Sequence, residues 1–283
     1  MLNKCKITGF ADEIDPSLDV QMKVLNELGQ EYLELRGVDG IGVADLTIEK
    51  AIEIKERMLN QGIRVSAIGS PIGKIGIDDD FEEHFEKFKH VVKLAQLFET
   101  PYIRMFSFYL PDEESPEAYR QQVFSRMSRM IDYAKKENVV LLHENEKGIY
   151  GAKAGQCKAL FEQFYGEHFK GIFDFANFIQ CNQDTKEAYE MLKPYISYIH
   201  VKDARREDGE VVLPGEGDGQ LADIFTYLDN DQFDGYLSLE PHLFHFKGLD
   251  DLEKEIVGTK KESNGILAYK AAFNSLQGIL ASK

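Results

Sequence analysis

Eight short apolar segments recur along the chain, and a longer segment with helical periodicity follows each of them. The apolar segments have the length of β-strands, and their starts lie 25 to 40 residues apart, which leaves room for one strand, one loop and one helix in each repeat. This repetition constrains the fold more than any other feature. The predicted strands are CKITGFA (5–11), EYLELRG (31–37), IRVSAIGS (63–70), PYIRMFSF (101–108), VVLLHEN (139–145), GIFDFAN (171–177), ISYIHVK (196–202) and YLSLEPH (236–242).

Helix start and stop signals punctuate the segments between these strands. Asp15-Pro16 and Ser115-Pro116 each place a capping residue before a proline at the first helical position. Asp80-x-x-Glu83 has the form of a capping box, and apolar residues follow it at helical spacing. Gly29 and Gly62 predict helix ends.

Strictly alternating strands and helices predict a parallel sheet with right-handed crossovers. Eight such units in 283 residues fit a single closed (β/α)8 TIM barrel domain over residues 1–283. The alternative is an open doubly wound sheet, whose nucleotide-binding forms carry G-x-G-x-x-G after the first strand. That position here reads ITGFADEI, so we predict the barrel.

Charge and composition exclude several classes of partner. The formal net charge is −16, which disfavours nucleic acid and anionic membranes because both would be repelled. Three widely spaced cysteines indicate neither a disulfide framework nor a zinc ribbon. No apolar run approaches the length of a membrane span, and the first residues show no signal peptide. We therefore expect a cytoplasmic protein without nucleic-acid or membrane partners, and a homo-oligomer stays open.

Functional side chains of such a barrel gather where the strands end. Four consecutive predicted strands end in side chains that can bind a metal ion, namely Glu144, Asp174, His200 and Glu240. Alternation along each strand turns these four toward the barrel interior and His143 outward, toward the helices. We expect the four to lie at one level. Each alone has a structural explanation, but three converging carboxylates would repel each other strongly without a cation.

This ligand set of two glutamates, one aspartate and one histidine suits a divalent metal ion. We expect one ion, Mn²⁺ in the first place, with Mg²⁺, Co²⁺ and Zn²⁺ as alternatives. The ligand types alone do not decide between them.

The sequence resembles the sugar phosphate isomerase/epimerase group of the xylose isomerase-like TIM barrels. The resemblance covers essentially the whole chain and is most specific at YIHVKDA (198–204) with the glycine loop GEGDG (215–219). HEN (143–145), FDFAN (173–177) and LSLEPH (237–242) add to it. It implies one divalent ion held by Glu144, Asp174, His200 and Glu240, with the two glutamates as an acid/base pair on the two sides of the substrate.

Five further residues are expected to contact the substrate. Many relatives have a histidine where this chain has Asn177, which can bind a hydroxyl but cannot carry a proton. Arg206 occupies a place where sugar epimerases of the group often have an arginine. Lys202 and His242 share the inward direction of the ligands, and Glu34 ends the second strand at the expected pocket mouth. The alternative for Lys202 and Arg206 is pairing with the acidic surface.

The leading hypothesis is a metal-dependent isomerase or epimerase of a small sugar, sugar phosphate or related polyhydroxy carbonyl compound. The ion would stabilise an enediolate, while one glutamate removes the proton next to the carbonyl and a glutamate returns it. A lyase resembling inosose dehydratases, which expels a β-hydroxyl from the same enediolate, stays open. An endonuclease IV-like phosphodiester hydrolase is less favoured, because the chain has only seven histidines and a charge of −16. A non-catalytic metal-binding barrel is the last alternative.

The glycine loop at 215–219 has two interpretations. Its backbone N–H groups could hold a phosphate before the next helix. Glu216 and Asp218 would repel that phosphate, so we interpret the loop as a turn and helix cap.

Overall fold

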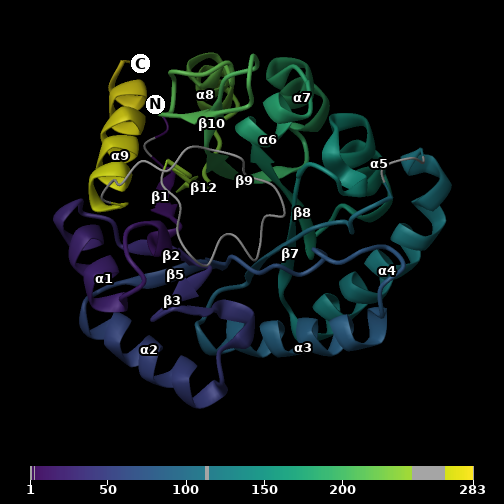
Figure 1. The fold of residues 1–283 in the computed structure, drawn as a ribbon, viewed down its shortest axis with the longest axis horizontal. Coiled ribbons are helices and arrows are strands. Elements are labelled where there is room, and N and C mark those ends of the chain that lie inside the picture. Colours follow the sequence, from purple (N-terminus) through teal and green to yellow (C-terminus); the bar gives the residue numbers. More distant parts are fainter. Residues whose placement is uncertain (1, 3, 112–114, 244–264, 283) are drawn as a thin grey trace.

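Eight parallel strands form one sheet in the computed structural model, which describes residues 2, 4–111, 115–243 and 265–282. The sheet order is β1-β12-β9-β8-β7-β6-β5-β2, so strands that follow each other along the chain are also neighbours in the sheet. The first and last strands of this order, β1 and β2, lie in contact, and the sheet curls into a nearly closed barrel (Figure 1). The strands are β1 (Lys6–Gly9), β2 (Tyr32–Leu35), β5 (Arg64–Ile68), β6 (Tyr102–Met105), β7 (Val140–Glu144), β8 (Phe169–Asp174), β9 (Ile196–Val201) and β12 (Tyr236–Leu239).

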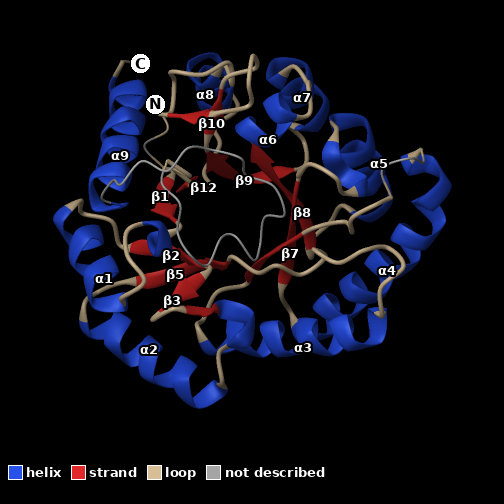
Figure 2. Cartoon of the chain, viewed as in Figure 1, coloured by secondary structure: helices blue, strands red, loops and turns tan. Residues whose placement is uncertain are grey.

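Helices surround this barrel on its outside, as Figure 2 shows. The predicted (β/α)8 TIM barrel is confirmed, and the open doubly wound sheet is excluded because the two ends of the sheet meet. The helices are α1 (Leu18–Glu27), α2 (Ile48–Asn60), α3 (Phe81–Leu97), α4 (Pro116–Glu137), α5 (Ala154–Phe164), α6 (Phe175–Gln180), α7 (Thr185–Leu192), α8 (Leu221–Asn230) and α9 (Gly265–Ala281).

Most of the predicted helix signals are confirmed. Ser115 is the N-cap of α4 with proline in the first turn, and the Asp80 carboxylate accepts backbone N–H groups at the start of α3. The signal at Asp15-Pro16 is misplaced, because α1 begins at Leu18 with Ser17 as its N-cap. The Asp15 carboxylate instead accepts the N–H of Ser17 at 2.8 Å, which forms a turn before the helix.

One strand ends earlier than its sequence predicts, and this matters for the site. The apolar segment 171–177 was expected to be extended throughout, but β8 ends at Asp174 and α6 begins at Phe175. The turn forms because Asp174 Oδ1 accepts the N–H of Asn177 at 2.7 Å, as an N-cap does. The aspartate therefore sits where the strand meets the helix.

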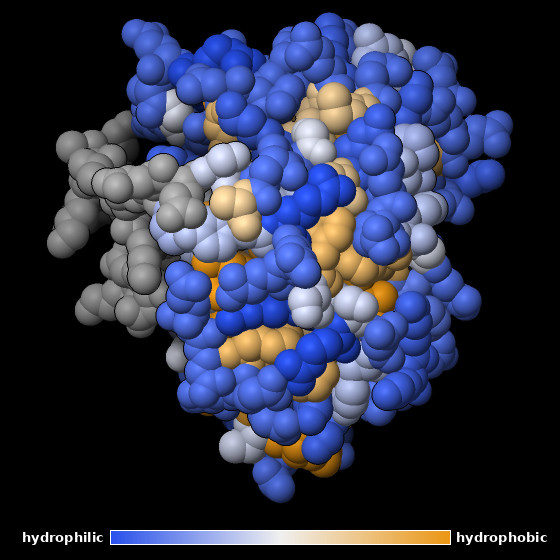
Figure 3. Space-filling view, turned by 90° about the vertical axis from the view of Figure 1, so that its right-hand side faces the viewer, coloured by the Kyte–Doolittle hydropathy of each residue, from blue (hydrophilic) through white to orange (hydrophobic). Residues whose placement is uncertain are grey.

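Two apolar layers hold the barrel together. Outward residues such as Ile103, Leu141 and Phe173 are fully buried between the strands and the helices. Inward residues such as Leu142 and Ile172 form a smaller cluster inside the barrel. The outer face shown in Figure 3 is mainly hydrophilic, with apolar residues in separate patches.

Two expectations about the whole chain can be compared with the structure. Cys5, Cys157 and Cys181, which the sequence does not predict to form a disulfide framework, are free thiols in the structure. Among the described helices, none combines the length and apolar character that crossing a lipid bilayer requires.

Candidate metal centre

Four side chains meet at the end of the barrel where the strands finish. Glu144 and Asp174 are the last residues of β7 and β8, His200 lies near the end of β9, and Glu240 directly follows β12. These strands are consecutive in the sheet, as the sequence predicted. All four side chains are buried, and one potential ligand atom from each lies within 4.8 Å of the others.

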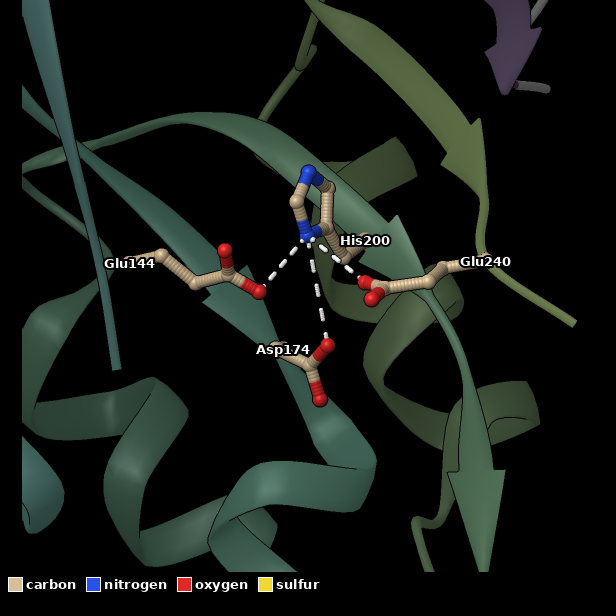
Figure 4. Close-up of side chains that lie close together, drawn as sticks. All are labelled: Glu144, Asp174, His200 and Glu240. Carbon is tan, nitrogen blue, oxygen red and sulfur yellow. Dashed lines mark hydrogen bonds and ion pairs between the residues drawn. The ribbon is translucent and has the colours of Figure 1, made fainter. Parts of the chain in front are cut away.

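The three carboxylates point at the same atom, Nδ1 of His200, as Figure 4 shows. Its distance is 2.8 Å to Glu144 Oε1, 3.1 Å to Glu240 Oε2 and 4.0 Å to Asp174 Oδ2. The other ring nitrogen points away from the three carboxylates. The side chains thus surround one small volume with three oxygens and one nitrogen.

The four residues are offset in strand register, yet their side chains gather at one level of the barrel, as the sequence predicted. Asp174 pairs in register with His200, but Glu144 pairs with Ile172 and His200 pairs with Ser238. Glu144 is therefore offset from Asp174 by two residues in register, and Glu240 is offset from His200 by two residues. Because barrel strands are tilted, positions at one height are staggered in register, so these offsets keep the four side chains together.

The donor set fits a divalent metal ion. Asp174 Oδ2 and Glu240 Oε2 are buried oxygens that face the cluster, and the charges near them are those of Lys202 at 3.2 Å and His200 at 3.1 Å. Burial removes the hydration of these carboxylate oxygens, and one ion pair each offsets that cost only in part. A divalent cation would satisfy both oxygens and would also offset the mutual repulsion of the carboxylates.

Protons and charges are distributed unevenly over this cluster. Burial raises the pKa of Asp174 to about 8, although Lys202 attracts its negative charge. For Glu144 the effect of burial is outweighed by the positive charges of His200 and Arg104, which lower its pKa to about 2. Burial also opposes a charge on His200, yet Glu144 and Glu34 raise its pKa well above the ordinary value. A metal ion would therefore have to displace protons from His200 and Asp174.

Two buried cations form ion pairs with the carboxylates of the cluster. Arg104 on β6 places Nη1 at 3.2 Å from Glu144 Oε2. Lys202 places Nζ at 3.2 Å from Asp174 Oδ2 and 3.4 Å from Glu240 Oε1. Both cations are 5% exposed. The predicted inward direction of Lys202 is thus confirmed, and it ends beside the cluster.

Asn177 and His242 also lie beside the cluster, as expected. The amide of Asn177 donates to the carbonyl of Asn145 at 2.9 Å and to Glu144 Oε1 at 3.5 Å. Nδ1 of His242 is 3.3 Å from Glu240 Oε1 and 3.3 Å from Glu13 Oε1. Substrate contacts of these two side chains stay predictions.

Glu34 does not lie at the pocket mouth. It is 1% exposed and lies inside the barrel, where its Oε2 is 3.1 Å from Nε2 of His200. Ser238 donates its hydroxyl to the same oxygen at 2.6 Å. The expected place at the pocket mouth is therefore wrong, whereas a contact between Glu34 and the substrate stays a prediction.

Arg206 lies away from the four converging residues, on the exposed turn between the short strands β10 (Asp203–Ala204) and β11 (Val211–Val212). Its backbone N–H donates to Asp218 at 2.6 Å. Its side chain lines a cavity of about 540 Å³ that none of the four cluster residues lines. A contact between Arg206 and the substrate stays a prediction.

The glycine loop is filled by the protein itself. The N–H groups of Gly215, Gly217 and Gly219 all donate to the carboxylate of Asp203, at 2.9 to 3.0 Å. The donors that might cradle a phosphate are therefore occupied. This confirms the interpretation of the loop as a turn. The predicted helix cap is not found, because the N-cap residue of α8 is Gln220 and its side chain forms no cap hydrogen bond.

Two further charged residues belong to the site but did not emerge as site residues from the sequence. Arg104 has the inward parity of its strand, and that signal could have identified it. Lys74 lies in the loop after β5, 3.0 Å from Glu146 and 4.5 Å from the centre of the Phe106 ring. Nothing in its local sequence distinguishes Lys74, because a loop has no periodicity.

Comparison with known proteins gives the following similarities. The chain matches the family model described as xylose isomerase-like TIM barrel over residues 22–259. A 3-dehydroshikimate dehydratase from Bacillus anthracis is 23% identical over 186 residues, which cover 64% of this chain. The match spans 65% of that enzyme, slightly less than two thirds of its length.

Solved structures share the fold over nearly the whole chain. L-ribulose 3-epimerase has a TM-score of 0.77 at 16% identity and covers 98% of this chain and 95% of its own. The IOLI protein with a bound zinc atom has a TM-score of 0.77 at 14% identity and covers 98% of both chains. The proteins similar to this chain thus include an epimerase and a dehydratase.

Proposed function

Because the chain belongs to the xylose isomerase-like TIM barrel family, we propose that it is a divalent-metal-dependent isomerase or epimerase of a small sugar, sugar phosphate or related polyhydroxy carbonyl compound. Glu144 and Glu240 are its acid/base pair. The observation that carries the proposal is that their carboxylates approach Nδ1 of His200 from opposite sides, at 2.8 and 3.1 Å. Groups on two sides of a planar carbon can exchange protons with both of its faces.

The four converging side chains, Glu144, Asp174, His200 and Glu240, would hold the ion, with Mn²⁺ as the first candidate. A bound divalent ion supplies a Lewis acid that polarises the substrate carbonyl. The protein contributes the dry, fixed surroundings, since all four side chains are buried and low exposure strengthens electrostatic interactions.

The protein also prepares each glutamate for proton transfer. Glu144 directs Oε1 to the cluster, while Arg104 holds Oε2 at 3.2 Å. Glu240 directs Oε2 to the cluster, while Lys202 and His242 face Oε1. The neighbouring cations keep both carboxylates ionised near neutral pH despite burial, so each can accept a proton from carbon and then return it.

Lys202, Arg104 and Asn177 are proposed to orient the substrate. Their side chains combine two cations with an amide, and such groups bind the hydroxyl, carbonyl or anionic oxygens of a polyhydroxy compound. His242 is proposed to join them from the side of Glu240. Lys202, Arg104 and Asn177 are 2–5% exposed, and the side chain of His242 is 4% exposed.

A dehydratase is the second candidate, and two observations favour it. The similar enzyme from Bacillus anthracis is a 3-dehydroshikimate dehydratase. In this chain, Lys202 places an ammonium group within 3.4 Å of both Asp174 and Glu240. An ammonium next to the base can protonate a departing β-hydroxyl, so that removal of the α proton leads to loss of water.

A metal-supplemented screen tests both candidates. Ketoses, ketose phosphates, inososes and 3-dehydroshikimate are incubated with the protein and Mn²⁺ in deuterated water, and products are identified by mass spectrometry and NMR. An isomerase or epimerase gives a product that keeps all heavy atoms of the substrate and carries deuterium next to the carbonyl. A dehydratase gives a product that is lighter by one water. Turnover that persists without any divalent ion would contradict the proposed mechanism.

A further inference from the structure

The two ring nitrogens of His200 face different groups. Nδ1 faces the three carboxylates, whereas Nε2 lies 3.1 Å from Glu34 Oε2. Glu34 belongs to β2 and is 166 residues away in the chain. It is 1% exposed, which is rare for a glutamate without a specific role.

The chemistry of these groups restricts the state of the imidazole. An ionised carboxylate only accepts hydrogen bonds, so it pairs with an N–H and not with the lone pair of a neutral ring nitrogen. A neutral imidazole has one N–H and one lone pair. Without a metal ion, both ring nitrogens face carboxylates and both pair as N–H groups. When an ion replaces the proton on Nδ1, the N–H that remains is directed at Glu34 and the lone pair on Nδ1 faces the ion.

Packing fixes the orientation of both partners. The Phe10 and Tyr198 rings meet the His200 ring edge-on, with centroid distances of 5.2 and 5.8 Å. The hydroxyl of Ser238 donates to Glu34 Oε2 at 2.6 Å. The imidazole therefore has little freedom to flip, and Glu34 is held in place beneath it.

We propose that Glu34 is a positioning residue that selects the Nε2–H tautomer of His200 and so presents Nδ1 as a metal ligand. The inference rests on the metal site of the proposed function and adds a residue that is not one of its ligands. A carboxylate that accepts the second N–H of a ligating histidine also makes the histidine a better donor, and loss of such a partner typically costs about 10–100-fold in metal affinity.

The test measures Co²⁺ affinity of the full chain by isothermal titration calorimetry after removal of bound metal. Glu34→Ala leaves Nε2 without its acceptor and should weaken binding by about 10–100-fold. Glu34→Gln keeps the shape but offers both a donor and an acceptor, so it no longer selects one tautomer and should weaken binding by about tenfold. Thr8→Val is the matched control, because it removes a buried hydroxyl that bonds Ser66 and not His200; its affinity should be unchanged.

NMR of the ¹⁵N-labelled, Zn²⁺-loaded protein reads the tautomer directly, and His200→Asn identifies the His200 signal. The wild type and Thr8→Val should carry the proton on Nε2, and this signal should be lost or weakened in both Glu34 variants. A wild-type proton on Nδ1, or wild-type affinity in both Glu34 variants, overturns the inference. If His200→Asn abolishes Co²⁺ binding while both Glu34 variants keep wild-type affinity, the metal site of the proposed function stands and only the role of Glu34 is overturned. If the wild type binds no Co²⁺, the metal site and this inference both fail.

Discussion

The interior of the barrel has two layers of side chains, which lie two residues apart along each strand. In the lower layer, Leu142, Ile172 and Tyr198 pack with Ala67 as a buried cluster. In the upper layer, the same strands carry Glu144, Asp174 and His200. The backbone is the same in both layers, and every one of these side chains is 0–4% exposed.

The difference between the layers is energetic. Burial of apolar surface in the lower layer stabilises the fold by roughly 25 cal/mol per Å². Burial of charges in the upper layer costs free energy, which ion pairs and a bound cation only partly offset. The lower layer therefore stabilises the barrel, and the upper layer keeps reactive groups dry at the expense of stability. Substitutions in the two layers should accordingly affect different properties.

The largest effect is the loss of bound metal that we expect when a proposed ligand in the upper layer is removed. The wild type should bind about one divalent ion per chain, and His200→Ala or Asp174→Ala should lose most of it, since each variant removes one of the four ligands and its share of the binding free energy. Asp174→Asn is a useful control because asparagine keeps the helix cap of α6 but removes the charge. Elemental analysis after gel filtration gives the stoichiometry, and an unchanged metal content in both alanine variants would rule out this site.

A large effect on turnover is expected when a glutamate loses its charge. Glu144→Gln and Glu240→Gln keep the side-chain shape but remove the base, and each should lower turnover by at least about 10²-fold, the usual scale for an acid/base residue. Wild-type enzyme in deuterated water should label the carbon next to the substrate carbonyl, as NMR of recovered substrate shows. Full activity in both variants would remove the glutamates from the mechanism.

The lower layer should respond in stability rather than in metal binding. Leu142→Ala removes a fully buried side chain and should reduce the free energy of unfolding by about 2–5 kcal/mol, because it leaves a cavity. Urea denaturation measures this loss, and elemental analysis should still find about one ion per chain. Loss of the ion with no loss of stability would contradict the division between the two layers.

A smaller effect on the free energy of unfolding, limited to acid pH, is expected from His143 on the outer side of β7. His143 neighbours Glu144 but points outward, against Phe161 of α5, and burial lowers its pKa from 6.5 to about 4. The unfolded chain therefore takes up a proton below pH 6.5 that the folded protein accepts only near pH 4. This difference should reduce the free energy of unfolding by up to about 3 kcal/mol between those pH values.

The control for this pH effect is His143→Asn, which cannot titrate. Its free energy of unfolding, measured in urea across the same pH range, should fall less steeply with acid than that of the wild type. Equal slopes in the two proteins would show that His143 does not titrate on unfolding.

The fold and the four converging residues were predictable from the sequence because they depend on local periodicity. Strand alternation has a period of two, so Glu144, Asp174, His200 and Glu240 could be directed inward without knowledge of any contact between strands. The repeat of strand and helix likewise specified the order of the strands in a parallel sheet. Both features are visible within short stretches of the chain.

The contacts around those residues were decided only by the tertiary structure. The offsets in strand register bring Glu144 and Glu240 to the same imidazole, and the side chain of Glu34 meets His200 across 166 residues. The tertiary structure also brings Arg104 to Glu144 and places Asp203 as the acceptor inside the glycine loop. The reason is physical: strand direction is set by neighbours along the chain, whereas the partner of a buried charge is set by the tilt and closure of the whole barrel.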